Sequence, residues 1–424
     1  MKYSVAGISE VIMIPEIKIN QQRIWDSLMT LGQIGGTEEG GCCRLALTEL
    51  DRQARDTFIN WCKDAGCEIS IDQIGNIFAR RPGTNPDAAA ITTGSHLDTQ
   101  PTGGKFDGIY GCLAGLEVIR TLNDHNIQTF RPVEVSVWTN EEGSRFAPAM
   151  IASGVFCGEF DIDYGLSRAD SEGVTIGEAL KQIGYDGAEP VGQRDIHRFF
   201  ELHIEQGPVL EQEKLDIGIV TGVLGMRWYD LVIKGTSAHA GPTPMAYRQD
   251  ALYASACMIK ELFELAHSNE EGNTRSTFGC LDVIQPSRNV IPGEVRLTVD
   301  LRHSDLDGLQ SLEQKAREII AAIAEQSGTT AELNCIWDSP PTAFAPECIE
   351  AVGNAVKDTG LSYCELVSGA GHDAVYLSRK VPTSMIFVPS VGGISHNEAE
   401  WSTIEQIGAG TQVLFNVMQT QANI

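Results

Sequence analysis

The sequence predicts an α/β fold in which a doubly wound mixed sheet, covered by helices on both faces, is interrupted by a smaller inserted domain. Three observations support this prediction. Short apolar stretches alternate with helical patterns along the first half, polar clusters follow several of these stretches, and the pattern changes near residue 218 and again at Pro340 and Pro341. At 424 residues, the chain also exceeds the length that one hydrophobic core usually serves.

The first half of the chain opens with two predicted helices. Residues 20–34 place apolar side chains at helical spacing, and Thr48-Glu-Leu-Asp51 is typical of a capping box that opens a second helix towards Cys62. A further helix is expected at about 112–122, and strands are expected at 67–71, 76–80, 89–96, 133–138 and 199–207. In such sheets, ligands bind beyond the carboxyl ends of the strands.

The middle of the chain follows a β-α-β-β-α-β order, which is typical of a compact ferredoxin-like domain. Helices are expected at 248–267 and 306–326, and strands at 229–234, 277–285, 293–302 and 330–337. A strand at 384–388 and an amphipathic end helix then complete the first domain. We therefore expect one domain over 1–217 and 339–424, and an inserted domain over 218–338.

The composition is that of an ordinary soluble globular protein, with 42% hydrophobic and 21% charged residues. A formal charge of -26 and a pI near 4.7 argue against nucleic acid and anionic membrane surfaces as partners, because no basic patch is available to neutralise phosphates. We expect no signal peptide or membrane span at the N-terminus, since Glu10, Pro15 and Glu16 interrupt its apolar run. No role is predicted for the first twenty residues.

Eleven cysteines are scattered from Cys42 to Cys364 without a Cys-x-x-Cys pair. This scatter indicates reduced thiols packed as small apolar side chains, and speaks against a disulfide framework or a thiolate zinc site. The chain is therefore expected in the cytoplasm.

Polar residues gather at the predicted strand exits and in adjoining glycine-bearing loops: His96, Asp98, Asp107, Glu141, Glu142, His203 and His396. Taken singly, each has an ordinary explanation as a solvated loop acid, a core histidine or a turn residue. Their coincidence at strand exits favours a site for one or two divalent metals such as zinc, manganese or cobalt, because imidazoles and carboxylates are ligands of these ions.

Several motifs in this order resemble the amidase, hydantoinase/carbamoylase family: GSHLDT, GGKFDGIYG, NEEGSRF, ELHIEQGPVL, HAGPTPM and ISHNE. This family contains N-carbamoyl-L-amino-acid hydrolases, allantoate amidohydrolases and yeast-type β-ureidopropionases. It is a branch of the dinuclear metallopeptidases related to aminoacylase and carboxypeptidase G. The resemblance runs from about residue 20 to the C-terminus.

The resemblance implies two divalent metal ions per subunit, zinc or otherwise manganese, cobalt or nickel. His96, Asp107 and His203 would bind one ion. Asp107, Glu142 and His396 would bind the other, so that Asp107 bridges the pair.

The resemblance also makes Glu141 the general base, so the two adjacent glutamates would divide the work between proton transfer and metal binding. Asp98 follows His96 closely enough to fix the tautomer of its imidazole. The histidine at position 203 resembles the residue that carbamoyl and ureido hydrolases have there, whereas the peptidase relatives carry a carboxylate at this position.

Further residues would recognise the substrate if the resemblance holds. Asn289 and Arg302 would grip its carboxylate, and His239 would reach a neighbouring active site across a homodimer built by the inserted lid domain. The segments that would line the ureido pocket contain Gln206, Gly369 and Gly371. Taken alone, Arg302 is as consistent with an exposed strand end, and the glycines with a turn. His372 beside Asp373 is interpreted as a pocket or structural residue.

The expected activity is hydrolysis of a small anionic ureido compound, an N-carbamoyl-L-amino acid or N-carbamoyl-β-alanine, to the amino acid, ammonia and carbon dioxide. The first alternative is an allantoate amidohydrolase. Further alternatives are an acylamino-acid deacylase or dipeptidase, and a binding module that keeps the fold without the reaction.

Overall fold

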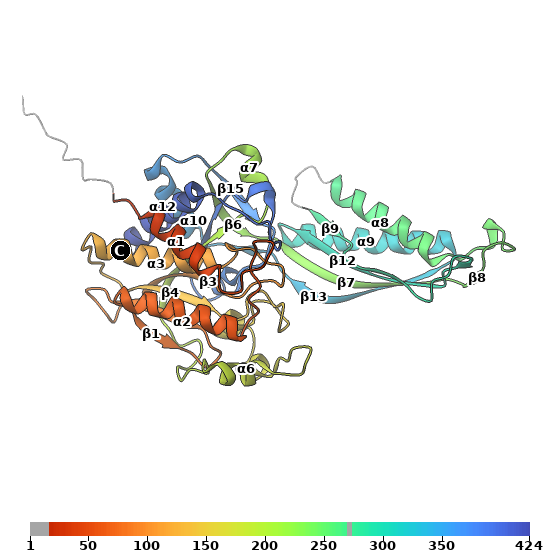
Figure 1. The fold of residues 1–424 in the computed structure, drawn as a ribbon. Helices are drawn as coiled ribbons and strands as arrows, with labels where there is room; N and C mark the ends of the chain where they lie inside the picture. The colour runs from red at the N-terminus through yellow and green to blue at the C-terminus, as the bar shows by residue number, and fades with distance from the viewer. Residues whose placement is uncertain (1–16, 269–273) are drawn as a thin grey trace, which may run out of the picture.

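A computed structural model describes residues 17–268 and 274–424 of the chain. Figure 1 shows two bodies: a thick one in which helices surround a sheet, and an elongated one in which two long helices lie along a second sheet. The α/β class with a large mixed sheet is confirmed. Among the described residues, no helix has the length and apolar character needed to cross a membrane.

The thick body is built on a nine-stranded sheet. Its strands lie in the order β1 (Glu68–Ile71), β2 (Ile77–Arg81), β4 (Val133–Trp138), β3 (Ala90–His96), β5 (Ile196–Ile204), β16 (Thr383–Val388), β6 (Ile217–Val223) and β14 (Thr342–Ala343), and β15 (Tyr363–Ser368) pairs with β6. The four central strands β4, β3, β5 and β16 are parallel to one another. Their carboxyl ends therefore meet at one edge of the sheet.

Helices cover both faces of this sheet: α1 (Gln21–Leu31), α2 (Glu49–Asp64), α3 (Ile109–Asp124), α4 (Ile151–Cys157), α5 (Ile162–Ser167), α6 (Ile176–Ile183), α7 (Val209–Glu213), α10 (Pro346–Thr359), α11 (Asp373–Leu377) and α12 (Ile404–Gln421). Strand β5 shows how the faces divide. Phe200 and Leu202 pack in the core formed with α3 and α12, whereas Phe199 packs in the core that contains Ala374 of α11. Because successive side chains of a strand point to opposite faces, His203 lies on the α11 side.

The helix starts follow local capping rules. Asn20 accepts a hydrogen bond from the Arg23 N–H at the start of α1, and Thr48 accepts one from the Asp51 N–H at the start of α2. The expected capping box at Thr48 has a different second hydrogen bond. The Asp51 carboxylate accepts the N–H of Leu47, at 2.8 Å, in place of the N–H of Thr48.

The elongated body carries its own sheet in the order β10 (Leu281–Val283), β12 (Glu294–His303), β7 (Gly225–Lys234) and β13 (Thr330–Ser339), with β9 (Arg275–Thr277) paired to β12. Helices α8 (Ala251–His267) and α9 (Leu306–Ser327) close a separate hydrophobic core on one face of this sheet. A small pair, β8 (Ala238–His239) with β11 (Val290–Ile291), lies at the far end of this body (Figure 1).

The sheets suggest slightly different domain boundaries from those expected. Strand β6 belongs to the large sheet, so position 218 falls inside a strand of the first body. The strand expected over 277–285 is divided into β9 and β10. We therefore place the inserted domain at 224–339, as a proposal that rests on sheet membership.

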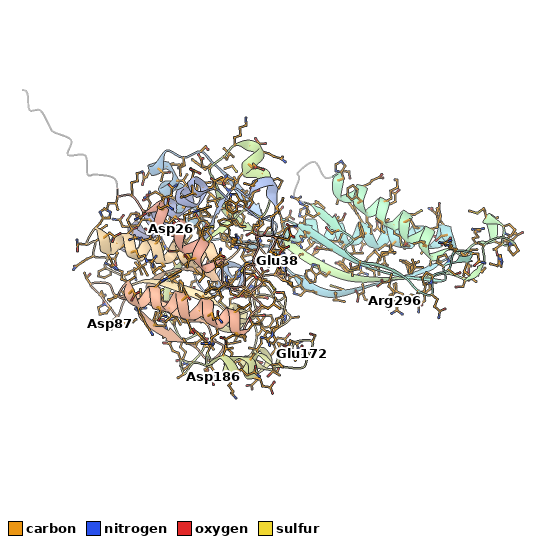
Figure 2. All side chains as sticks on the ribbon, in the orientation of Figure 1. Asp26, Glu38, Asp87, Glu172, Asp186 and Arg296 are labelled. Carbon is orange, nitrogen blue, oxygen red and sulfur yellow. The ribbon has the colours of Figure 1, made fainter. Side chains whose placement is uncertain are left out.

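Part of the acidic charge of the chain lies on the surface. Figure 2 labels five exposed acidic side chains around the thick body, Asp26, Glu38, Asp87, Glu172 and Asp186. A negatively charged surface repels anionic partners unless a positively charged side chain binds them locally.

Candidate metal centre and active site

Four parallel strands deliver the candidate ligands to one edge of the sheet. His96 ends β3, His203 lies at the end of β5, and Glu142 follows β4. His396 lies in the segment beyond β16, and Asp107 lies in the loop between β3 and α3. The expected set of five therefore converges at the sheet edge where ligands of such folds bind.

Asp107 is shared by two groups of potential metal ligands, His96 with His203 and Glu142 with His396, and the ligand atoms within each group lie within 4.8 Å of one another. Its Oδ1 lies 3.6 Å from His96 Nε2 and 3.1 Å from His203 Nε2. Its Oδ2 lies 3.4 Å from His396 Nε2. The two oxygens of one carboxylate thus face two different groups, which is the arrangement of a bridging ligand.

Backbone carbonyls fix the tautomers of the two buried histidines. His96 Nδ1 lies 2.9 Å from the Asp98 carbonyl oxygen, and His203 Nδ1 lies 2.9 Å from the Ile204 carbonyl oxygen. A carbonyl only accepts, so each Nδ1 donates its proton and each Nε2 keeps a lone pair directed at Asp107.

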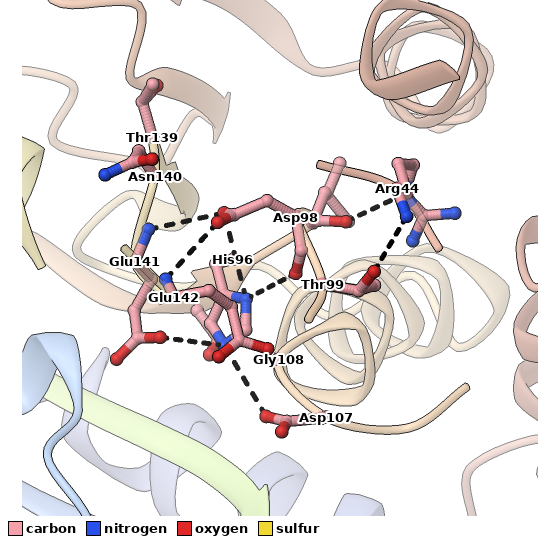
Figure 3. Close-up of polar contacts among 12 residues, drawn as sticks. Arg44, His96, Asp98, Thr99, Asp107, Gly108, Thr139, Asn140, Glu141 and Glu142 are labelled. Carbon is pink, nitrogen blue, oxygen red and sulfur yellow. Dashed lines mark hydrogen bonds and ion pairs between the residues drawn. The ribbon is translucent and has the colours of Figure 1, made fainter. Parts of the chain in front are cut away.

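The Asp98 side chain has a different role from the one expected. Its carboxylate accepts the backbone N–H groups of Glu141 and Glu142, each at 3.3 Å, and only approaches His96 Nδ1 to 3.9 Å (Figure 3). The tautomer of His96 is therefore set by the carbonyl of Asp98, while its carboxylate holds the turn that carries the glutamate pair.

That turn directs the two glutamates to different partners. Glu141 Oε2 lies 3.5 Å from His96 Nε2, whereas Glu142 Oε2 lies 3.4 Å from His396 Nε2. Gln100 also donates to both oxygens of Glu142, through its backbone N–H at 3.1 Å and its side-chain amide at 2.7 Å. Glu142 is thus fixed beside Asp107, whereas no described residue donates a hydrogen bond to the Glu141 carboxylate, which lies beside His96.

Several acidic side chains are buried close together at this edge of the sheet, and this shifts their pKa values. Burial, opposed by His96, raises the pKa of Glu141 well above its usual range, and burial with the nearby Asp107 raises the pKa of Glu142 to about 7. Burial also opposes ionisation of Asp107, but the three neighbouring histidines, His203, His396 and His96, hold its pKa well below its usual range. A divalent cation relieves such crowding of carboxylates, so the donor set fits a metal pair in both chemistry and charge.

The loop that carries Asp107 is held by a residue that the sequence did not indicate. The Glu400 carboxylate is buried, and its Oε1 accepts the backbone N–H groups of Phe106 and Asp107, each at 3.1 Å. Its Oε2 accepts the hydroxyl of Ser395, at 2.8 Å, next to His396. A side chain at Gly104 would lie 2.0 Å from this carboxylate, which explains the glycine there.

Gly108, which follows Asp107, allows the imidazole of His96 to approach. Its φ is +67°, and an added Cβ would lie 2.3 Å from the ring. Gln100 directly follows the motif GSHLDT, which contains His96, and Glu400 lies in SHNEAE, which contains His396, but a single sequence offers no sign that their side chains turn inwards.

A cavity of about 260 Å³ opens over the ligand cluster, between the two bodies. The expected substrate residues Gln206, Arg302 and Gly371 line it, and so does His372. The Gln206 side-chain amide donates to Asp107 Oδ2 at 2.8 Å, while its carbonyl oxygen is buried without a hydrogen-bond partner. The carbonyl oxygen of Gly369 accepts a hydrogen bond from Arg302 at 2.5 Å. This contact links the two bodies.

His372 packs against the candidate ligand His203, with ring centroids 4.6 Å apart, and its Nε2 lies 3.0 Å from the Ser368 hydroxyl. Burial and the neighbouring His203 lower the pKa of His372 well below its usual range. These contacts favour a neutral pocket residue over a further metal ligand.

Two of the residues that were expected to contact the substrate do not line the cavity of their own chain. His239 lies on β8, and Asn289 directly precedes β11, at the far end of the elongated body. They lie side by side there, since the Ala240 N–H donates to the Asn289 carbonyl at 2.8 Å.

Comparison with known proteins places this arrangement among characterised relatives. The model of peptidase family M20/M25/M40 matches residues 92–420. An N-carbamoyl-L-amino-acid amidohydrolase of Rhizobium meliloti is 44% identical over 407 residues, which cover 96% of this chain and 98% of the relative. An allantoate amidohydrolase of Bacillus subtilis is 34% identical, with 93% and 96% covered.

Solved structures agree with the sequence relatives. A crystal structure of an amidase of the hydantoinase/carbamoylase family from Burkholderia multivorans superposes with a TM-score of 0.93 at 52% identity, covering 96% of this chain and 99% of that chain.

The contacts of Glu400 generate a prediction about metal affinity. Glu400→Ala leaves two buried N–H groups without an acceptor and frees the Asp107 loop, so we expect metal affinity to fall by about 10- to 100-fold. Glu400→Gln keeps an acceptor for both N–H groups and is expected to stay within about threefold of the parent. Glu405→Ala, at an exposed position of α12, is the matched control.

Titration of the metal-free variants with Zn²⁺ or Mn²⁺ in a calorimeter measures this affinity. Equal loss in the Gln and Ala variants would mean that Glu400 acts through its charge, and unchanged affinity in the Ala variant would remove its positioning role.

Proposed function

The chain belongs to peptidase family M20/M25/M40, and from this premise we propose that it hydrolyses the ureido C–N bond of an N-carbamoyl-L-amino acid. The resemblance to hydantoinase/carbamoylase amidases is confirmed, and close relatives named amidohydrolases make the chain a hydrolase of C–N bonds. In the proposed reaction, one water and one ureido substrate yield one amino acid, one ammonia and one carbon dioxide.

One observation carries the proposal: Asp107 joins two donor groups beneath a cavity, with Glu141 beside them. His96 and His203 would hold one divalent ion with Asp107, and Glu142 and His396 would hold the second. When bound, such a pair lowers the pKa of a water molecule and polarises a carbonyl group. Zinc, manganese, cobalt and nickel all suit imidazole and carboxylate donors.

Glu141 is placed to move the proton. Its carboxylate lines the cavity next to His96, and within the described part of the chain no hydrogen-bond donor holds it. We assign it to accept a proton from the attacking water and to deliver that proton to the leaving nitrogen. The Asp98 carboxylate maintains this position through the backbone N–H of Glu141.

The substrate's carboxylate has one cationic partner in the cavity. Arg302 is the single arginine or lysine among the described residues that line it. Asp300 fixes the orientation of its guanidinium, with Nη2 and Oδ2 2.7 Å apart. A planar guanidinium binds a carboxylate in a bidentate manner, so this end of the cavity favours an anionic substrate despite the charge of -26.

Assays of ammonia release and of free amino-acid release test the proposal, because hydrolysis of an N-acetyl amino acid yields acetate and the amino acid without ammonia. Enzyme reconstituted with Zn²⁺ or Mn²⁺ is supplied with N-carbamoyl-L-methionine, N-carbamoyl-β-alanine, allantoate and N-acetyl-L-methionine. We expect turnover of the N-carbamoyl-L-amino acid that a chelator abolishes. Preferred turnover of allantoate would indicate an allantoate amidohydrolase, like the relative from Bacillus subtilis. Preferred turnover of the acetyl compound would establish a deacylase.

We also propose a cytoplasmic homodimer in which the elongated body of one subunit serves its partner. The position of His239 and Asn289 supports this, because they lie together at the far end of that body, away from the cavity of their own chain. In a dimer, His239 would donate to the oxyanion that develops on the ureido carbonyl.

Glu141→Gln should retain its metals and lose nearly all turnover, by about a thousandfold or more, because the amide cannot accept the proton of water. Metal analysis and steady-state kinetics on one preparation measure both properties. Asp186→Asn, which also replaces a carboxylate with an amide but at an exposed position of the thick body, is the control for a general loss of charge. Substantial remaining turnover in Glu141→Gln would exclude it as the base.

The dimer proposal predicts complementation. His239→Ala and Glu141→Gln subunits are each expected to be inactive as homodimers. A mixed dimer has one site that combines an intact Glu141 with an intact His239 from the partner, so an equimolar mixture that exchanges fully should recover about one quarter of the parental rate. Subunits that exchange without recovering activity would show that His239 does not act across the interface.

A further inference from the structure

The cavity over the ligand cluster has two walls of different character. One wall belongs to the large sheet and carries the imidazoles and carboxylates. The other belongs to the elongated body and carries Met226, Trp228, Arg302 and Trp337. Apart from Arg302, this second wall consists of large apolar side chains that the reaction chemistry does not use.

Strand register explains why these side chains face the cavity. On β7, Tyr229 and Leu231 point into the core beneath α8 and α9, so Met226 and Trp228 lie on the opposite, uncovered face of the sheet. On β12, Arg302 is directly opposite Met226. Directly opposite residues of an antiparallel pair share a face, and diagonal neighbours lie within reach of large side chains. Arg302 therefore lies beside Met226 and diagonally from Trp228.

A β-bulge brings the second tryptophan to the same place. The register of β13 against β7 shifts between Cys335 and Trp337, so that Trp337 and not Ile336 is opposite Trp228. The two indole rings meet edge to face, with centroids 4.6 Å apart at 64°. Trp228 is still 42% exposed, so part of its indole ring remains available for contact with a ligand.

From this geometry we infer that Trp228 and Trp337, with Met226, form the subsite for the substrate's side chain, so that the preferred substrates are N-carbamoyl-L-amino acids with a large aromatic or thioether side chain. The inference rests on the proposed function and names the substrate class within it. A molecule held by its carboxylate at Arg302 and by its ureido group at the ligand cluster has its α-carbon between these points. Its side chain then lies against Met226 and the tryptophan pair.

The same wall disfavours the smaller and more polar candidates. N-carbamoyl-β-alanine and N-carbamoylglycine have no side chain to bury on it. Allantoate has a second ureido group at that position, and this group loses its hydrogen bonds to water on an apolar surface. Aromatic and thioether groups instead gain contact with the ring edges and faces.

Selectivity measured within single enzyme preparations tests the inference. For the parent enzyme, kcat/KM for N-carbamoyl-L-phenylalanine and N-carbamoyl-L-methionine should exceed that for N-carbamoylglycine by about 10- to 100-fold, the range expected for burial of a large side chain. Trp228→Ala and Trp337→Ala should each reduce this ratio by about tenfold or more, mainly through loss on the large substrates. Trp337→Leu, which keeps an apolar surface, should retain an intermediate ratio.

Ile336→Ala is the matched control, since Ile336 belongs to the same bulge but does not line the cavity. It should leave the ratio within about twofold of the parent. Because the ratio compares two substrates on one preparation, partial unfolding lowers both rates and leaves the ratio intact.

The failure of this inference is separable from that of the proposed function. If the parent enzyme hydrolyses no N-carbamoyl amino acid, the proposed function itself is wrong. If it hydrolyses N-carbamoylglycine as efficiently as the phenylalanine compound, or if both alanine variants keep the parental ratio, the function stands and the tryptophan subsite is overturned.

Discussion

The constraint on which this structure depends is the Asp107 carboxylate, whose two oxygens face two different groups of donors. Two imidazoles approach one oxygen, and a third approaches the other. This position is held from behind by Glu400, through the backbone of the loop, and from the side by the Gln206 amide. If the carboxylate turned or moved, the two groups of donors would no longer share a ligand.

The buried acids around Asp107 are tolerated because nearly every one has a defined donor. Asp98 accepts two backbone N–H groups, Glu142 accepts two from Gln100, and Glu400 accepts two from the Asp107 loop. Glu141 is the exception, since its carboxylate has an imidazole neighbour but no donor of this kind. The physical difference between the adjacent glutamates is therefore their hydrogen bonding, and this difference supports the proposal that Glu142 binds metal while Glu141 exchanges a proton.

The two bodies contribute different kinds of specificity to one cavity. The large sheet supplies charge and imidazole at the ends of its strands, and the second sheet supplies Arg302 and an apolar wall from a face that its own helices leave uncovered. The contact between Arg302 and the Gly369 carbonyl connects them. In the proposed function, the first body would carry the reaction chemistry and the second would select the substrate.

The sequence by itself indicated the fold class, several of the helices and most of the strands, because hydrophobic periodicity is a local property. Position at strand exits singled out seven polar residues, and the family resemblance chose the five candidate ligands among them. Helix α10 was not expected, although Pro346 at its start and Gly360 after its end are local signals of a helix. Only the tertiary structure decided which atoms of Asp98 act, why Glu400 and Gln100 turn inwards, and where His239 lies. It also revealed that a bulge at Ile336 sets Trp337 against Trp228. These features arise from contacts between residues far apart in the chain, and no local pattern encodes them.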